Sequence, residues 1–148
     1  MLFVGRTCHP RWVELTGADF DAIPRRNLHV PRVEFARLWL AAEQYIDEHP
    51  KDWYGAGVAV TCRWLGNATV RPATGRWYKQ YAPVTLRQGA AYEEVIEAEC
   101  VAAEKVLMLR PVPSWVASQP GWFEAILATL DWAWRHGPVP LAVHQPAG

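Results

Sequence analysis

Cysteine is scarce in this chain. The three cysteines, Cys8, Cys62 and Cys100, are widely spaced and odd in number, and no CxxC pair occurs. A disulfide framework usually has an even number of cysteines, and a zinc ribbon needs closely spaced pairs, so neither is expected. The thiols are predicted to be reduced and mostly buried, and no cofactor or metal is expected.

Long hydrophobic runs are also missing. The longest apolar stretch lies around residues 55–60 and is followed by Arg63, whereas a membrane-spanning helix needs about 18–20 apolar residues in succession. Residues 1–10 show neither a basic segment ahead of an apolar stretch nor a small-residue cleavage site, so no export signal is indicated. We therefore expect a soluble chain without a membrane segment, located in the cytoplasm.

The short motifs of several enzyme classes do not occur. The sequence has no GxxxxGK[ST], GxGxxG, HExxH or GxSxG motif and no EF-hand loop, so phosphate-binding loops, dinucleotide sites and zinc proteases lack support. Cys8 and His9 are adjacent, so their side chains tend to point apart, and the other histidines have no ligand spacing. A non-catalytic role is therefore expected more strongly than an enzymatic one.

Apolar residues, by contrast, are plentiful. The chain has 148 residues, of which 51% are hydrophobic and 20% charged, a composition typical of a folded globular protein of one domain. Nine of the residues are tryptophans. Those expected on helical core faces are Trp39, Trp64, Trp122 and Trp134. Those expected in turns or off the apolar stripes are Trp12, Trp77, Trp115 and Trp132.

Helical periodicity dominates the pattern of these apolar residues. Apolar positions recur every three or four residues in the segments 33–49, 53–66, 90–109 and 121–135. Asp52 is the expected N-cap of the second segment, although two glycines weaken that helix and its residues 58–64 are also compatible with a strand. The predicted fold is mainly α: a single-domain bundle of about four helices.

The remaining segments are not regular. Residues 1–30 are predicted to form an irregular arm containing one helical turn at 19–22, where Thr16 and Asp19 have the spacing of a capping arrangement. Residues 68–88 contain prolines and a TG turn and are predicted to form a long connection or a loose hairpin. The proline-rich tail 138–148 is expected to be frayed or to lie on the surface.

Charge is unevenly distributed although the formal net charge is zero. Between Trp53 and Tyr92 every charged residue is basic, and between Glu93 and Glu104 every charged residue is acidic. In the basic block, cations alternate with aromatic rings, a pattern that suits nucleic-acid binding but also a connection whose rings plug a core. The candidate residues of this block are Arg71, Arg76, Trp77, Tyr78, Lys79 and Tyr81.

The acidic block falls on the predicted helix 90–109. Its candidate residues are Glu93, Glu97 and Glu104, which lie one or two turns apart along one face. Carboxylates at this spacing can hold metals, but di-metal helical sites need an ExxH motif that this helix lacks. A solvated or partner-facing acidic surface is therefore the preferred interpretation.

These observations favour a non-catalytic protein–protein interaction module, adaptor or accessory subunit. Its acidic helix and its basic aromatic connection are expected to be complementary surfaces for a protein partner or for a second copy. One alternative is a nucleic-acid-associated regulator that uses the segment 63–87. Another is an enzyme or small-ligand carrier with a tryptophan-lined pocket.

Overall fold

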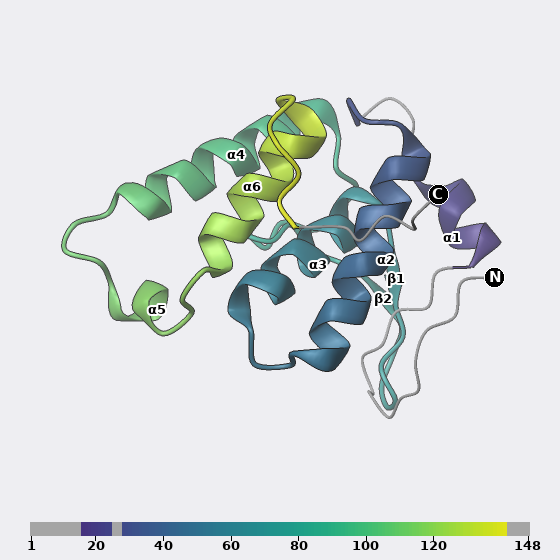
Figure 1. Cartoon of the computed structure of the whole chain (residues 1–148), viewed down its shortest axis with the longest axis horizontal. Coiled ribbons are helices and arrows are strands. Elements are labelled where there is room, and N and C mark those ends of the chain that lie inside the picture. The colour runs from purple at the N-terminus through teal and green to yellow at the C-terminus, as the bar shows by residue number, and fades with distance from the viewer. Residues whose placement is uncertain (1–15, 25–27, 142–148) are drawn as a thin grey trace, which may run out of the picture.

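The computed structural model describes residues 16–24 and 28–141, and this part of the chain is mainly helical (Figure 1). It contains six helices and one antiparallel sheet of two short strands. The expectation of a mainly α protein is confirmed. None of the helices in the described ranges is long and apolar enough to cross a membrane.

The first long helices, α2 (Arg32–Glu48) and α3 (Trp53–Leu65), begin and end close to the predicted positions. Asp52 caps α3 as expected, because its carboxylate accepts a hydrogen bond from the backbone N–H of Gly55 at 3.3 Å. The alternative of a strand within 58–64 is wrong. Gly57 lowers the helix propensity of this segment, but it permits close packing. A Cβ at this position would lie 2.8 Å from the Cβ of Ala125 on another helix.

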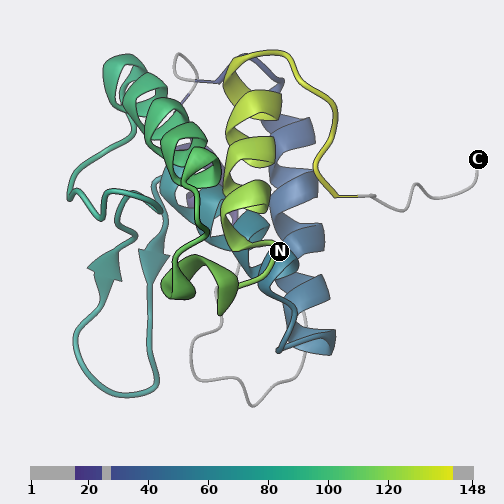
Figure 2. The ribbon, with the colours of Figure 1, turned by 90° about the vertical axis from the view of Figure 1, so that its left-hand side faces the viewer.

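The later helices are α4 (Glu93–Met108), α5 (Ser114–Ala117) and α6 (Trp122–Trp134). Direct packing joins α2 to α3, α3 to α6 and α6 to α4. Figures 1 and 2 show α4 at one side of the molecule, with α6 between it and α2. Because α4 has its main helix contacts on the side of α6, its opposite side is left uncovered.

A helix also forms in the segment predicted to be an irregular arm. This helix, α1 (Gly17–Ala22), starts two residues before the predicted turn. Thr16 and Asp19 form a complete capping box, in which each side chain accepts a hydrogen bond from the other's backbone N–H, at 3.2 and 3.0 Å. The predicted arm also includes residues 1–15, which lie outside the described ranges.

The segment 68–88 forms a loose hairpin, one of its two predicted forms. Strand β1 (Thr69–Val70) pairs with β2 (Tyr78–Lys79) in antiparallel register. The loop after β2 is attached to α4 because Glu99, which is buried, accepts the backbone N–H groups of Val84 and Thr85 at 2.8 and 3.3 Å. This attachment holds the loop after β2 against α4, whereas Figure 1 shows the strands β1 and β2 themselves on the other side of the view from α4.

The set of buried tryptophans differs from the one predicted. Trp39 and Trp64 are buried as predicted, but Trp122 and Trp134 are only partly buried. Trp132, expected off the apolar stripe, is 6% exposed and stacks on Phe35 of α2. The reason is that α6 lies between neighbouring helices, so its buried surface is wider than one stripe.

Candidate interaction surface

Helix α4 has two contrasting faces. Its inner face consists of the buried residues Ile96, Glu99, Cys100 and Ala103. Its outer face includes the exposed residues Glu93, Glu94, Glu97, Ala98, Val101, Lys105 and Met108. The outer face thus exposes apolar side chains to solvent, and another protein surface could pack against them.

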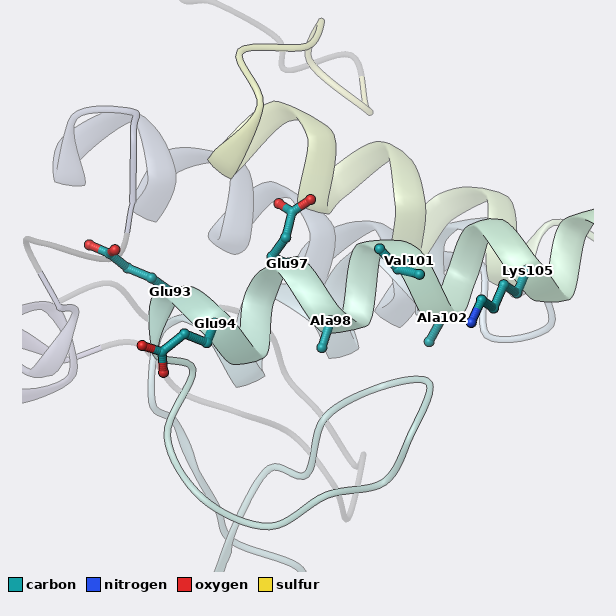
Figure 3. A pocket seen from close by; sticks show the side chains of 7 residues that line it. All are labelled: Glu93, Glu94, Glu97, Ala98, Val101, Ala102 and Lys105. Carbon is teal, nitrogen blue, oxygen red and sulfur yellow. The ribbon is translucent and has the colours of Figure 1, made fainter.

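The outer face forms a shallow, open groove of about 740 Å³ (Figure 3). The residues that line it are Glu93, Glu94, Glu97, Ala98, Val101, Ala102 and Lys105. The acidic side chains gather at the N-terminal end of α4, small and apolar side chains occupy the middle, and Lys105 lies toward the C-terminal end. The groove therefore changes charge from one end to the other.

Two of the predicted acidic residues are bound inside the chain. Arg135, which follows α6, pairs with Glu97 at 2.7 Å and with Glu104 at 2.8 Å. The hydrogen bonds from Arg135, and then from the indole Nε1 of Trp134, lower the pKa of Glu97. Glu97 and Glu104 thus help to attach α4 to α6, and the one charge of Arg135, which also lies 3.5 Å from Asp131, compensates part of their charge.

The other charges of the groove have no such internal partner. Within the described ranges, no salt bridge is formed by Glu93, Glu94 or Lys105, and all three are exposed. Opposite charges at the two ends of α4 are thus available to an external partner. Of the predicted acidic candidates, Glu93 is the one that remains at the surface without an ion pair in this part of the structure.

The basic aromatic candidates all lie on the hairpin. The rings of Trp77, Tyr78 and Tyr81 are exposed, Trp77 by 66%. The guanidinium of Arg71 lies 5.3 Å from the centroid of the Trp77 ring, a cation–π geometry, and also 3.6 Å from Asp19. These rings are therefore not plugs of the core, which was the structural alternative for this segment.

The two remaining candidate cations of the hairpin, Lys79 and Arg76, differ in their contacts. Lys79 donates a hydrogen bond to the backbone carbonyl of Asn67 at 3.0 Å, and Arg76 is exposed near the turn. Within the described residues, no salt bridge joins this hairpin to the acidic residues of α4. In the described part of the chain, the two charge blocks therefore do not neutralise each other through direct ion pairs.

A buried ion pair is a feature that the sequence analysis did not anticipate. Arg63 donates two hydrogen bonds to Glu43, both of 2.8 Å, and Trp39 Nε1 donates a third at 3.0 Å. Burial opposes the charge of Arg63, but the adjacent carboxylate of Glu43 outweighs it and raises the pKa of the guanidinium. The Trp39–Glu43 spacing of four residues was a possible signal, since side chains at i and i+4 meet on a helix.

This ion pair lines one of two cavities near the hairpin. The first, of about 480 Å³, lies between α2, α3 and β2, and Trp53 and Tyr78 contribute to its walls. The second, of about 310 Å³, is lined by Trp64, whose buried Nε1–H has no hydrogen-bond partner within the described residues. Each cavity is lined by a single tryptophan, so neither is the tryptophan-lined pocket considered from the sequence.

The described thiols are unsuited to nucleophilic chemistry. Cys62 and Cys100 are buried and free, and burial is the main cause of their raised pKa values, about 12 for Cys100. The expectation of reduced, buried thiols is confirmed for these two, while Cys8 lies outside the described ranges. Within those ranges, no group of three or more His, Cys, Asp or Glu residues is arranged to hold a metal ion.

Comparison of the chain with known protein families, with curated proteins and with solved structures finds no match. A function therefore has to be inferred from the residues themselves. Two surfaces combine exposed apolar or aromatic side chains with charge: the groove on α4 and the aromatic hairpin.

Proposed function

We propose that this protein is a non-catalytic interaction module, an adaptor or accessory subunit that binds another protein chain through α4 and the basic aromatic hairpin. The observation that carries the proposal is the uncovered groove along α4, with unpaired charge at its ends and exposed apolar side chains between them. A polar rim around an apolar centre is the usual composition of a protein–protein interface.

The hairpin supports the same function by its exposed rings. Tryptophan, tyrosine and arginine contribute most of the binding free energy in many interfaces, and here Trp77, Tyr78 and Arg76 are adjacent and exposed. The stacking of Arg71 on Trp77 restricts the ring before any partner arrives, which reduces the entropy lost on binding. The hairpin is therefore proposed as an anchor and α4 as the second contact.

Nucleic-acid binding is the less favoured alternative because the basic block is weaker than its composition indicates. Arg63 is bound by Glu43, and Arg71 lies within 3.6 Å of Asp19. Phosphate binding depends on cations that can displace counterions, and only part of this block remains available. The formal net charge of the chain is zero, whereas a nucleic-acid-binding domain usually has an excess of positive charge.

A ligand-carrier or enzyme function has still less support. Two charged groups of the larger cavity, Glu43 and Arg63, are hydrogen-bonded to each other, so neither is poised to act as an acid, base or anion site. The cytoplasmic location expected from the sequence remains a prediction.

Affinity capture after mild lysis, with identification of protein, nucleic acid and small molecules, tests the proposal. We expect a protein partner whose recovery falls in Trp77→Ala and in the Arg76→Ala/Lys79→Ala double variant, because these changes remove the anchor and its cations. Trp115→Ala is the matched control, since Trp115 is an exposed tryptophan outside both surfaces. Equal recovery from parent and hairpin variants, or recovery of nucleic acid alone, would contradict the proposal.

A further inference from the structure

We infer that the outer face of α4 binds the same face of a second copy of this chain, with the two helices antiparallel. The inference rests on the proposed interaction function and names the partner of the α4 surface. Three features of that face support it: the spacing of its exposed residues, the distribution of their charges, and the residues that flank them.

The spacing is that of a coiled-coil seam. The exposed residues Glu94, Ala98, Val101, Lys105 and Met108 follow one another at intervals of four, three, four and three. Two helices that pack side by side bury positions at this alternating interval, the a and d positions of a heptad. Such a seam normally faces another helix, whereas on α4 it faces solvent.

Charge decides the orientation of the second helix. Glu94 lies in the first turn of α4 and Lys105 in the last, so a parallel pair would place Glu94 against Glu94 and Lys105 against Lys105. An antiparallel pair instead brings each Glu94 to the Lys105 of the second copy and aligns the helix dipoles favourably.

The apolar residues fit the same register. When Glu94 lies opposite Lys105 of the second copy, the two-fold axis crosses α4 at the level midway between residues 99 and 100. In this register Ala98 lies opposite Val101 of the second copy. One register therefore pairs both unlike charges and both apolar positions, and it does so twice because the interface is symmetric. The small side chains of Ala98 and Ala102 allow the two helices to approach closely.

The edges of the seam also permit this approach. Glu97 and Glu104 flank it on the side of α6, where two copies would bring acidic residues together. Arg135 of the same chain pairs with both of them and with Asp131, so the repulsion at this edge is reduced but not cancelled, and it adds to the reasons for a weak dimer. The opposite edge is apolar, with Val95 and Ala102 partly buried.

The dimer is expected to be weak and reversible. A helix of 16 residues is about 24 Å long, and one helix pair of this length buries less than the roughly 800 Å² per partner of a stable interface. Met108, 75% exposed, extends the contact beyond the central layers. Association should therefore increase with concentration and weaken with salt.

Sedimentation of the full chain over a range of concentrations tests the inference. The parent is expected to show a monomer–dimer equilibrium. Glu94→Lys and Lys105→Glu each bring like charges together twice per dimer, and each should weaken dimerisation by about tenfold or more. The Glu94→Lys/Lys105→Glu double variant restores opposite charges and should dimerise like the parent.

The controls separate the register from a general effect of charge. Glu48→Lys on α2 and Lys51→Glu beside it change the net charge equally at exposed positions away from α4, and they should leave dimerisation unchanged. Far-UV circular dichroism checks that each variant keeps its helices. If a reversal disturbs folding, Glu94→Gln and Lys105→Gln replace it, with smaller losses expected.

A monomer at every concentration overturns the inference, as does a dimer that is insensitive to the reversals or not restored by the double variant. None of these outcomes bears on the hairpin or on capture of a different protein, so the proposed function can survive them. Conversely, a dimer that passes the test would stand even if the hairpin variants bound every partner normally.

Discussion

Trp132 and Trp134 of α6 occupy different environments, so they are expected to contribute different amounts to the free energy of unfolding. Trp132 lies in the core against Phe35, whereas Trp134 is partly exposed, stacks on His29 and donates a hydrogen bond to Glu97. Trp132→Ala should lower the free energy of unfolding by about 3–5 kcal/mol because it leaves a large cavity, and Trp134→Ala should cost distinctly less. Urea unfolding of both variants measures this, and equal losses would show that the two rings are equally buried.

The pair of Glu43 and Arg63 leads to a second prediction at the scale of single residues. Glu43→Gln should destabilise the protein by about 3–5 kcal/mol, because it leaves a buried guanidinium without its counter-charge. Glu43→Leu combined with Arg63→Met removes both charges and should cost less than the two single changes added together. A double-mutant cycle by denaturant unfolding gives the coupling, and additive losses would mean that the pair is solvated.

At the scale of elements, the link between α4 and α6 predicts a pH dependence. Arg135 holds the pKa of Glu97 below its ordinary value in the folded state, so Glu97 contributes stability above its unfolded pKa. This contribution is lost as the pH falls through the lowered folded pKa. In Arg135→Ala the pKa of Glu97 should rise toward that of an ordinary glutamate, as followed by NMR titration of the side-chain carboxyl.

Lys105→Ala is the matched control for this titration, because Lys105 lies on the same helix and forms no salt bridge in the described part of the chain. The pKa of Glu97 should stay low in that variant. An unchanged pKa in Arg135→Ala would show that α4 and α6 are not joined through Arg135. Asp131 has the opposite sign, since burial raises its pKa and its ionisation opposes folding as the pH rises.

At the scale of the whole molecule, two buried thiols report on global unfolding. Cys62 lies on α3 and Cys100 on α4, and both are fully shielded from solvent. In a Cys8→Ser variant, a thiol reagent such as DTNB should label neither cysteine in the native protein and both in denaturant, at rates that follow unfolding. Rapid labelling under native conditions would contradict a single packed arrangement of these helices.

The sequence alone determined the helices and most of their limits. Asp52 as an N-cap, the capping box of Thr16 and Asp19, and the apolar period of α4 act between residues within a few positions of one another. Such signals can be read from the sequence because they depend only on local geometry. On the same basis the sequence predicted an outward acidic face on α4, and it left the segment 68–88 open between a long connection and the loose hairpin that forms.

Tertiary structure alone decided which groups meet across the fold. Arg63 binds Glu43 over a separation of 20 residues, and Arg135 binds Glu97 over 38. Helical periodicity gives each of these residues a face but not a partner, because the partner depends on which helices pack together and at what angle. For the same reason, packing of α6 between its neighbours buried Trp132 and left Trp134 at the edge.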